Sequence, residues 1–393
     1  MELKLKKFRL LEKFVIYMFF FICIFAHLSY LVPENVTLLM SIGVMLISLV
    51  IFSIGKVSIK RFVIILITFM LLIPSLINSE EENILIPLMF FILPFLPFVF
   101  SPNTFLSQLD VYLLSMRIGV LLSILGVAVQ IFISPDLFGL PGHPTYSGEL
   151  MGTSNFRPTG FTGSPQNLAL FMSVGLFYKY SNYKIINFLI KLIIFVTGAS
   201  TLSTFFAGAV FVYLLFSIPL VFIIGAPFVI NYLWFEDFSN TKFEFLSISE
   251  IGTLDQRFMV DDFFDSNFIN FLIGYGPGTA TQGMIDRFYV QRNLYGAESF
   301  PLIILHEFGF IFTIFLLCIL TKIIYNSYFI WRTNAYNNIN ILAVTIILVT
   351  SIFLTPNFAS FRIKMIFIPI FLISLIPIIT TGKKDFKSHC SIN

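Results

Sequence analysis

The sequence predicts an all-α polytopic membrane protein, because of its composition, its long apolar runs and the distribution of its charges. Of the 393 residues, 57% are hydrophobic and only 11% are charged, whereas a soluble domain carries about a quarter charged residues. Phenylalanine alone occurs 51 times. Because so few charges cannot cover the surface of a soluble chain of this length, we expect lipid to be the solvent for most of that surface.

Apolar runs of helix-spanning length recur along the chain and predict about twelve spans. In the first half the expected spans are 14–32, 36–54, 62–77, 84–100, 111–133 and 165–178. In the second half they are 185–199, 202–217, 218–235, 299–321, 338–354 and 359–380. The region 185–235 holds either three short spans or one span and a long bent helix. We choose three, because the charges on either side require an odd number.

Lysine and arginine placement predicts that both termini are cytoplasmic, since cytoplasmic loops carry an excess of these residues. They cluster at alternate ends of the expected spans: Lys4, Lys6, Lys7, Arg9, Lys13, Lys56, Lys60, Arg61, Lys179, Lys184, Lys322, Arg332, Lys383, Lys384 and Lys387. The basic N-terminus and its apolar run resemble a signal sequence. The length of that run favours an uncleaved first span.

This topology places two long polar segments on the outer face, 134–164 and 236–298, within a single integral membrane domain, 1–393. Long loops in a compact protein are usually functional. The small net charge of +3 does not suggest nucleic acid as a partner,. Three cysteines imply no disulfide framework, and four scattered histidines show no metal-ligand spacing,. We therefore expect no metal and no cofactor.

The first outer loop ends in Arg157-Pro-Thr-Gly160-Phe-Thr-Gly-Ser-Pro165. Its Pro and Gly residues predict a defined turn, and Pro165 suits the first position of the next helix. Arg157 would then lie near a helix N-terminus, where the guanidinium and free backbone N–H groups attract phosphate. An interfacial arginine that extends to lipid headgroups is an equally good reading of this segment.

The second outer loop carries Arg257, Arg292 and the glycine-rich run Gly274-Tyr-Gly276-Pro-Gly278. These glycines could let backbone approach a ligand closely, although a plain turn explains them as well. The loop ends at Glu298, which should lie at the outer membrane boundary. His306 and Glu307 follow inside the next apolar run, where Glu307 could be a general base but a structural role is favoured.

These three segments together resemble motifs of the O-antigen polymerase and O-antigen ligase superfamily. The first is Arg157-x-x-Gly160-x-x-x-x-Pro165-x-x-x-Ala169, and the second is Gly274-x-Gly276-Pro-Gly278. The third is Glu298-Ser299-x-x-Leu302-x-x-Leu305-x-Glu307-x-Gly309. Their order and the oversized late loop also fit. The motifs cover about residues 110–325, and the remainder of the chain resembles the family only in topology.

The resemblance implies a metal-independent membrane glycosyltransferase with a GT-C-like helical fold in a bacterial inner (plasma) membrane. The expected substrate is an undecaprenyl-diphosphate-linked oligosaccharide, handled on the outer face. Arg157 and Arg257, together with Arg292, would bind the diphosphate, and Gly276 and Gly278 would line the substrate site. Glu298 would be the catalytic residue. Expected partners are membrane lipid, a chain-length regulator and a flippase.

Departures from the family pattern favour a polymerase of O-antigen, capsule or another exopolysaccharide over a ligase. Glu298 stands where ligases tend to carry a histidine, and His306 lies too far along the chain to replace it. A second departure does not bear on this choice: the segment Thr197–Thr201, among the short expected spans, lacks the arginine that many relatives have nearby. Two alternatives stay open: a ligase that moves finished glycan to another acceptor, and a flippase or transporter of lipid-linked oligosaccharide.

Overall fold

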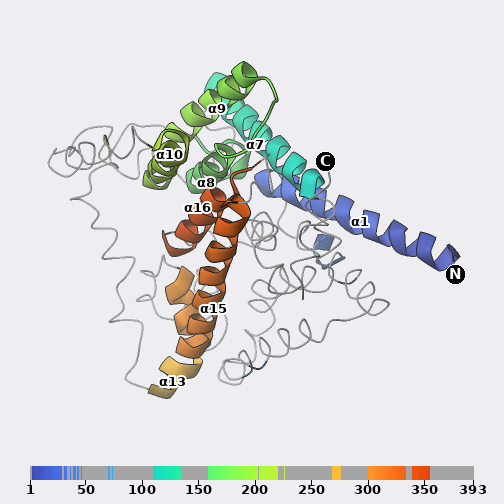
Figure 1. Ribbon diagram of the computed structural model, residues 1–393, viewed down its shortest axis with the longest axis vertical. Coiled ribbons are helices and arrows are strands. Elements are labelled where there is room, and N and C mark those ends of the chain that lie inside the picture. The colour runs from blue at the N-terminus through green and yellow to red at the C-terminus, as the bar shows by residue number, and fades with distance from the viewer. Residues whose placement is uncertain are drawn as a thin grey trace.

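The computed structural model describes residues 2–28, 31–32, 109–133, 158–201, 203–219, 268–275, 300–332 and 339–354, with single positions between 36 and 73 and at 225. Every regular element in these ranges is a helix (Figure 1). They are α1 (Glu2–His27), α7 (Leu109–Phe132), η4 (Gly160–Thr162), α8 (Pro165–Gly175), α9 (Lys184–Ala199), α10 (Thr204–Ser217), α13 (Phe268–Ile273), α15 (Phe300–Arg332) and α16 (Ile341–Leu354). The predicted all-α class is confirmed for the described residues.

Five helices begin and end close to the boundaries expected from apolar runs. These are α7, α8, α9, α10 and α16, for which the sequence predicts 111–133, 165–178, 185–199, 202–217 and 338–354. By contrast α1 begins at Glu2, well before the expected 14, because Lys and Glu are good helix formers that a search for apolar runs does not register,. The expected spans 36–54, 62–77, 84–100, 218–235 and 359–380 lie wholly or mostly outside the described residues.

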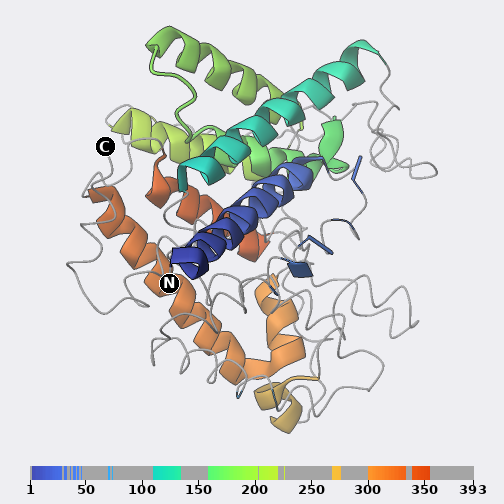
Figure 2. The same cartoon turned by 90° about the vertical axis from the view of Figure 1, so that its right-hand side faces the viewer.

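Two of the described helices are long and apolar enough to cross a membrane, Asp110–Phe132 and Ile304–Arg332. The second is interrupted, because Gly309 has φ 80° and ψ 175° and is not helical. In Figure 2 the two parts of α15 form a V with α13 at its vertex. The uninterrupted part, 310–332, is about 34 Å long at 1.5 Å per residue, and still exceeds a hydrocarbon core of about 30 Å. The expected span 299–321 therefore begins at the right place, but it is divided and extends further.

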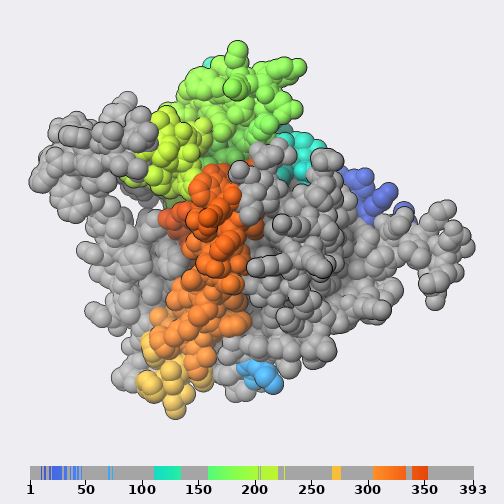
Figure 3. All heavy atoms as spheres, viewed as in Figure 1, coloured from blue at the N-terminus to red at the C-terminus, as the bar shows by residue number. Residues whose placement is uncertain are grey.

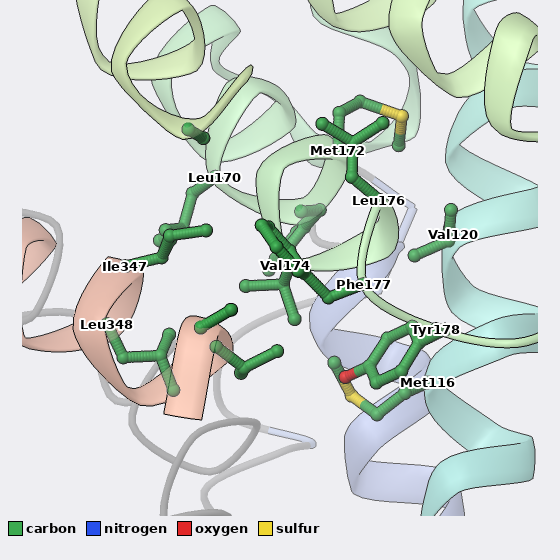
Figure 4. Close-up of a cluster of buried hydrophobic side chains, with 14 of the residues drawn as sticks. Met116, Val120, Leu170, Met172, Val174, Leu176, Phe177, Tyr178, Ile347 and Leu348 are labelled. Carbon is green, nitrogen blue, oxygen red and sulfur yellow. The ribbon is translucent and has the colours of Figure 1, made fainter. Parts of the chain in front are cut away.

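The core lies where α7, α8 and α16 meet, and Figure 4 shows its apolar side chains. Met116 and Val120 come from α7, Met172 and Val174 from α8, and Leu348 from α16, and none of the five is exposed. Many apolar side chains instead face outward on α9 and α15, and much of α15 lies at the surface in Figure 3. This outward apolar surface suits a lipid environment better than water.

The first helix packs beside α7 through a buried histidine near its end. His27 is fully buried, and its ring lies 4.0 Å from the ring of Phe171 on α8. The Ser123 hydroxyl donates to the Gly119 carbonyl at 3.0 Å. The Ser123 oxygen therefore accepts a hydrogen bond from His27 Nδ1 at 3.1 Å,. This pair ties the C-terminal end of α1 to the middle of α7.

The residues after α8 meet the residues before α16, although they are far apart in the sequence. Tyr178 and Ile339 form an isolated antiparallel bridge, and the Asn340 N–H donates to the Phe177 carbonyl at 3.4 Å. The side chains of Ser327 on α15 and Thr345 on α16 are hydrogen-bonded at 2.9 Å. These contacts bring Lys179, which directly follows Tyr178, to the end of the bundle where α16 begins.

Candidate functional site

The candidate site is built on the turn between α7 and α8, residues 158–165. The turn consists of the short helix η4 followed by Gly163 in a left-handed conformation, with φ 72°. Thr159, Gly160 and Thr162 are buried. The expectation of a defined turn at this motif is therefore confirmed from Pro158 onward.

A glutamine of α7 holds the turn through its side-chain amide. Gln130 is only 2% exposed, and its Oε1 accepts the backbone N–H groups of both Thr159 and Gly160 at 2.9 Å. The Gln130 Nε2 donates to the Thr159 hydroxyl oxygen at 3.4 Å. One buried side chain thus satisfies two backbone donors that would otherwise be costly to bury.

Two glycines allow the turn to lie directly on α7. Gly160 has φ 53°, and a Cβ on it would lie 3.0 Å from the Ser123 carbonyl oxygen. On the α7 side, a Cβ on Gly126 would lie 2.5 Å from the Phe161 nitrogen and 2.8 Å from its ring. The backbones therefore approach more closely than side chains would permit. This close contact with α7 explains why the first motif has a glycine at position 160, which the sequence alone did not explain.

The turn continues directly into α8. The Thr162 hydroxyl can donate to the carbonyls of Thr159, at 2.7 Å, and Ser164, at 3.0 Å. Pro165 is the first residue of α8, as the sequence predicts, and the Ser164 side chain forms no capping hydrogen bond. The Ser164 side chain therefore does not cap the first-turn N–H groups of α8,.

Replacing Gly126 with alanine tests this close approach. The added methyl group would meet backbone as well as the Phe161 ring, so we expect a loss of about 1–3 kcal/mol in the free energy of unfolding. The matched control is Gly208→Ala on α10, where a Cβ meets nothing within 4 Å. That change should be neutral or stabilising by up to about 1 kcal/mol. Thermal unfolding of the detergent-purified variants measures both, and equal melting temperatures for the two would contradict the close approach.

A second cluster joins the glycine run of the large loop to the break in α15. Gly274 has φ 87°, and a Cβ on it would overlap the Glu307 carbonyl oxygen and lie 2.7 Å from the Gly309 nitrogen. Gly309, with φ 80°, faces it in return, since its own Cβ would lie 2.5 Å from the Gly274 nitrogen. The two backbones therefore cross with no side chain between them.

Aromatic and polar contacts surround this glycine crossing, which we define as Gly274 against Gly309. The Tyr275 N–H donates to the His306 carbonyl at 2.8 Å, and their rings lie 4.5 Å apart. Phe271 of α13 stacks on Phe310 at 5.3 Å. Glu307 is fully buried beside Gly274. The structure thus brings part of the second motif onto part of the third.

The side chains expected to act on substrate lie outside the described residues. They are Arg157, Arg257, Arg292, Gly276, Gly278 and Glu298. The described residues next to them in the sequence lie in two places. Pro158, next to Arg157, belongs to the turn between α7 and α8, whereas Tyr275, next to Gly276, lies with α13 at the vertex of α15. Figures 1 and 2 both show α13 at the end of the molecule away from α8. The described residues contain no group of three His, Cys, Asp or Glu side chains that could hold a metal ion.

Sequence reasoning missed Gln130, the buried side chain that organises the first part of the site. The expected fifth span includes it, and a polar amide near the end of an apolar run was the available signal. A side-chain amide in hydrocarbon needs hydrogen-bond partners. The presence of Gln130 therefore indicated that a segment of irregular backbone, with unpaired N–H groups, lies nearby. His27 carried a similar signal, since it stands near the end of the first apolar run.

The described fold defines a helical protein in which two helices can cross a membrane, with a structured turn and a glycine crossing among its helices. No protein-family model, no curated protein and no solved structure matches this chain.

Proposed function

We propose that this protein is a membrane glycosyltransferase that polymerises a bacterial surface polysaccharide. The observation that carries the proposal is the glycine crossing, where Gly274 lies directly on the backbone of Glu307 and Gly309. It unites the second and third motif segments, which are separated in the sequence by the end of the large loop. A site assembled from a loop and a helix entry suits a substrate that presents both a sugar and a lipid-linked diphosphate.

The proposed reaction transfers a growing glycan from undecaprenyl diphosphate to a lipid-linked repeat unit. The bond between the anomeric carbon and the diphosphate oxygen breaks, and undecaprenyl diphosphate leaves. The acceptor hydroxyl forms the new glycosidic bond, and its proton passes to the Glu298 carboxylate. Arg157, Arg257 and Arg292 stabilise the negative charge that develops on the departing diphosphate.

The turn at 158–165 supports the role of Arg157 in this proposal. Arg157 is bonded to Pro158, and the backbone that follows is buried and hydrogen-bonded to Gln130. The uncapped start of α8 lies a few residues further along. An arginine directly before such a turn and a helix N-terminus directly after it are residues of the kind that bind phosphate oxygens.

The distribution of charges supports a membrane position for the protein, with the site on the outer face. Lys179 directly follows Tyr178, which is bridged to Ile339 just before the start of α16. This lysine belongs to a loop for which the sequence predicts a cytoplasmic position. Pro165, at the other end of α8, then lies toward the outer face.

Deleting the gene tests the proposal and separates it from the alternatives. Loss of a polymerase should leave single repeat units on undecaprenyl diphosphate at the outer face. Mass spectrometry of extracted lipids measures their length, and reaction with a membrane-impermeant reagent in intact spheroplasts measures their face. Loss of a ligase would instead leave full-length lipid-linked glycan, and loss of a flippase would leave single repeats on the cytoplasmic face. Either of these results would refute polymerisation, and restoring the gene on a plasmid should restore polymer.

A further inference from the structure

Arg117 is a charged side chain inside α7, one of the two described helices that are long and apolar enough to cross a membrane. It lies about 12 Å along the helix axis from Leu109, at 1.5 Å per residue. An arginine is not deprotonated in proteins, and a charge at such a depth is costly unless it reaches an anion or the headgroup layer. The proposed reaction on the outer face assigns no role to this arginine.

Arg117 lies at the border between the buried and the exposed faces of α7, because residues three and four apart are neighbours on a helix. Leu113 and Val120 on one side of it are buried. Leu114 and Leu121 on the other side are 49% and 45% exposed. Arg117 itself is partly buried. Its side chain is therefore held against protein on one side and borders a surface that would face lipid on the other.

The guanidinium of Arg117 has an enclosed N–H group that the described part of the chain does not satisfy. Its Nε is inaccessible and forms no hydrogen bond with the described residues. Asp110, the acid of α7, lies about 10 Å nearer the start of the helix,. Since a guanidinium offers five N–H donors and no acceptor, a group with several anionic oxygen atoms is the complementary partner.

Two tyrosines in the chain that follows α8, Tyr178 and Tyr180, lie close to Arg117 and interact with it electrostatically. The Tyr180 hydroxyl donates to the Gly175 carbonyl at 3.1 Å. A Cβ on Gly175 would lie 3.2 Å from that hydroxyl and 3.2 Å from the Val120 side chain. Tyr180 therefore lies beside α7, within about one turn of Arg117. The two tyrosines thus bring aromatic rings and hydroxyl groups close to the charged side chain.

We propose that Arg117 binds the phosphate of an anionic phospholipid whose acyl chain lies along the exposed leucines of α7. The guanidinium fork matches phosphate oxygens, and Leu121 and Leu125, further along the helix, present an exposed apolar surface to the chain. Tyrosine rings favour the headgroup level, which suits Tyr180. Lys179 directly precedes Tyr180 and adds a positive charge to this loop, so anionic lipids are preferred over zwitterionic ones. The proposal does not depend on the proposed reaction.

Native mass spectrometry of the detergent-purified full-length protein, titrated with dioleoyl phosphatidylglycerol, tests this proposal. Dioleoyl phosphatidylcholine, which has the same acyl chains and no net charge, is the comparison lipid. We expect the wild type to bind phosphatidylglycerol about tenfold more tightly, because charge-assisted interactions are stronger than neutral ones. Equal affinity for the two lipids would contradict a site for an anionic phospholipid.

Substitutions of Arg117 locate the binding. Arg117→Leu and Arg117→Gln remove the charge, and each should lower the affinity for phosphatidylglycerol about tenfold. Arg117→Lys keeps the charge but loses the fork, so we expect a loss of about threefold. Arg332→Leu, at the exposed end of α15, is the matched control for losing one arginine and should stay within about twofold of the wild type. If Arg117→Leu is recovered poorly, the polar Arg117→Gln decides. Wild-type affinity in Arg117→Gln, or an equal loss in Arg332→Leu, would overturn the proposal.

Two further probes establish which phosphate compound occupies the site. Inorganic phosphate at millimolar concentration should not displace phosphatidylglycerol, because it lacks the acyl chains that contact the leucines. Undecaprenyl phosphate has a single branched chain in place of two acyl chains and should bind more weakly. Displacement by inorganic phosphate would identify a plain anion site. Tighter binding of undecaprenyl phosphate that is lost in Arg117→Gln would assign the site to the carrier lipid, and either result would refute the phospholipid.

Discussion

Replacing either glycine of the crossing with alanine is expected to remove a large part of the protein's stability. Gly309 combines φ 80° with ψ 175°, a region that is essentially restricted to glycine and costs about 1–3 kcal/mol for other residues. A Cβ on Gly274 would lie 2.6 Å from the Glu307 carbonyl carbon. The obstacles on both sides are backbone atoms, which cannot rotate away as a side chain can. Adding about 1–3 kcal/mol for overpacking consumes a large part of a typical stability of about 5–15 kcal/mol.

The measurement is the yield and the melting temperature of Gly274→Ala and Gly309→Ala after purification in detergent. Gly208→Ala is again the matched control, since it adds the same methyl group to an exposed helical position. We expect both crossing variants to be recovered poorly or to melt well below the control. A Gly309→Ala variant that melts with the wild type would contradict the broken geometry of α15.

The second large effect is expected from the two side chains assigned to the chemistry, Arg157 and Glu298. Arg157→Ala removes the proposed stabilisation of the leaving diphosphate, and Glu298→Gln removes the proposed base. Removing a charge-stabilising group typically costs about 10²–10³ in rate, and removing a general base costs about 10²–10⁴. Each variant should therefore leave short glycans or single repeats, measured by gel separation of the surface polysaccharide.

Matched controls for these variants lie at other positions of the fold. Arg332→Ala removes an arginine at the end of α15, and Asp110→Asn neutralises an exposed acid in the first turn of α7. Both should give polymer of normal length, with protein amounts checked by immunoblotting. Glycans of wild-type length in both Arg157→Ala and Glu298→Gln would refute the assignment of these residues.

Much of the helical framework was predictable because apolar length is a strong signal. The ends of α8 illustrate this, since Pro165 marks its start as the sequence predicts and Gly175 ends it a few residues before the expected 178. The division of α15 was not predictable from apolar length, because His306, Glu307 and Gly309 interrupt the apolar run too briefly to end a predicted span. Its conformation is set by contact with Gly274, which is distant in sequence. Hydropathy records solvent preference and does not report such backbone crossings.

The candidate site was predictable in part for the same reason. A turn at 158–165 followed from its Gly and Pro residues, whereas its anchor on Gln130 depends on tertiary contact across the α7–α8 junction. Similarly, α13 lies inside the expected large loop 236–298, where six residues gave too short an apolar signal to predict a helix. Its packing against α15 supplies the stability that local preference lacks.

The bridge between Tyr178 and Ile339 has a consequence for the order in which the protein is made. Roughly 160 residues separate the two partners, and loops of this length close late and at an entropic cost,. At about 5–20 residues per second, Ile339 is synthesised roughly 8–30 s after Tyr178. During that interval α16 has not yet been synthesised, so the apolar face of α8 that packs against it in the folded protein is not covered by α16. We therefore expect the newly made N-terminal half to depend on the insertion machinery or chaperones until α16 arrives.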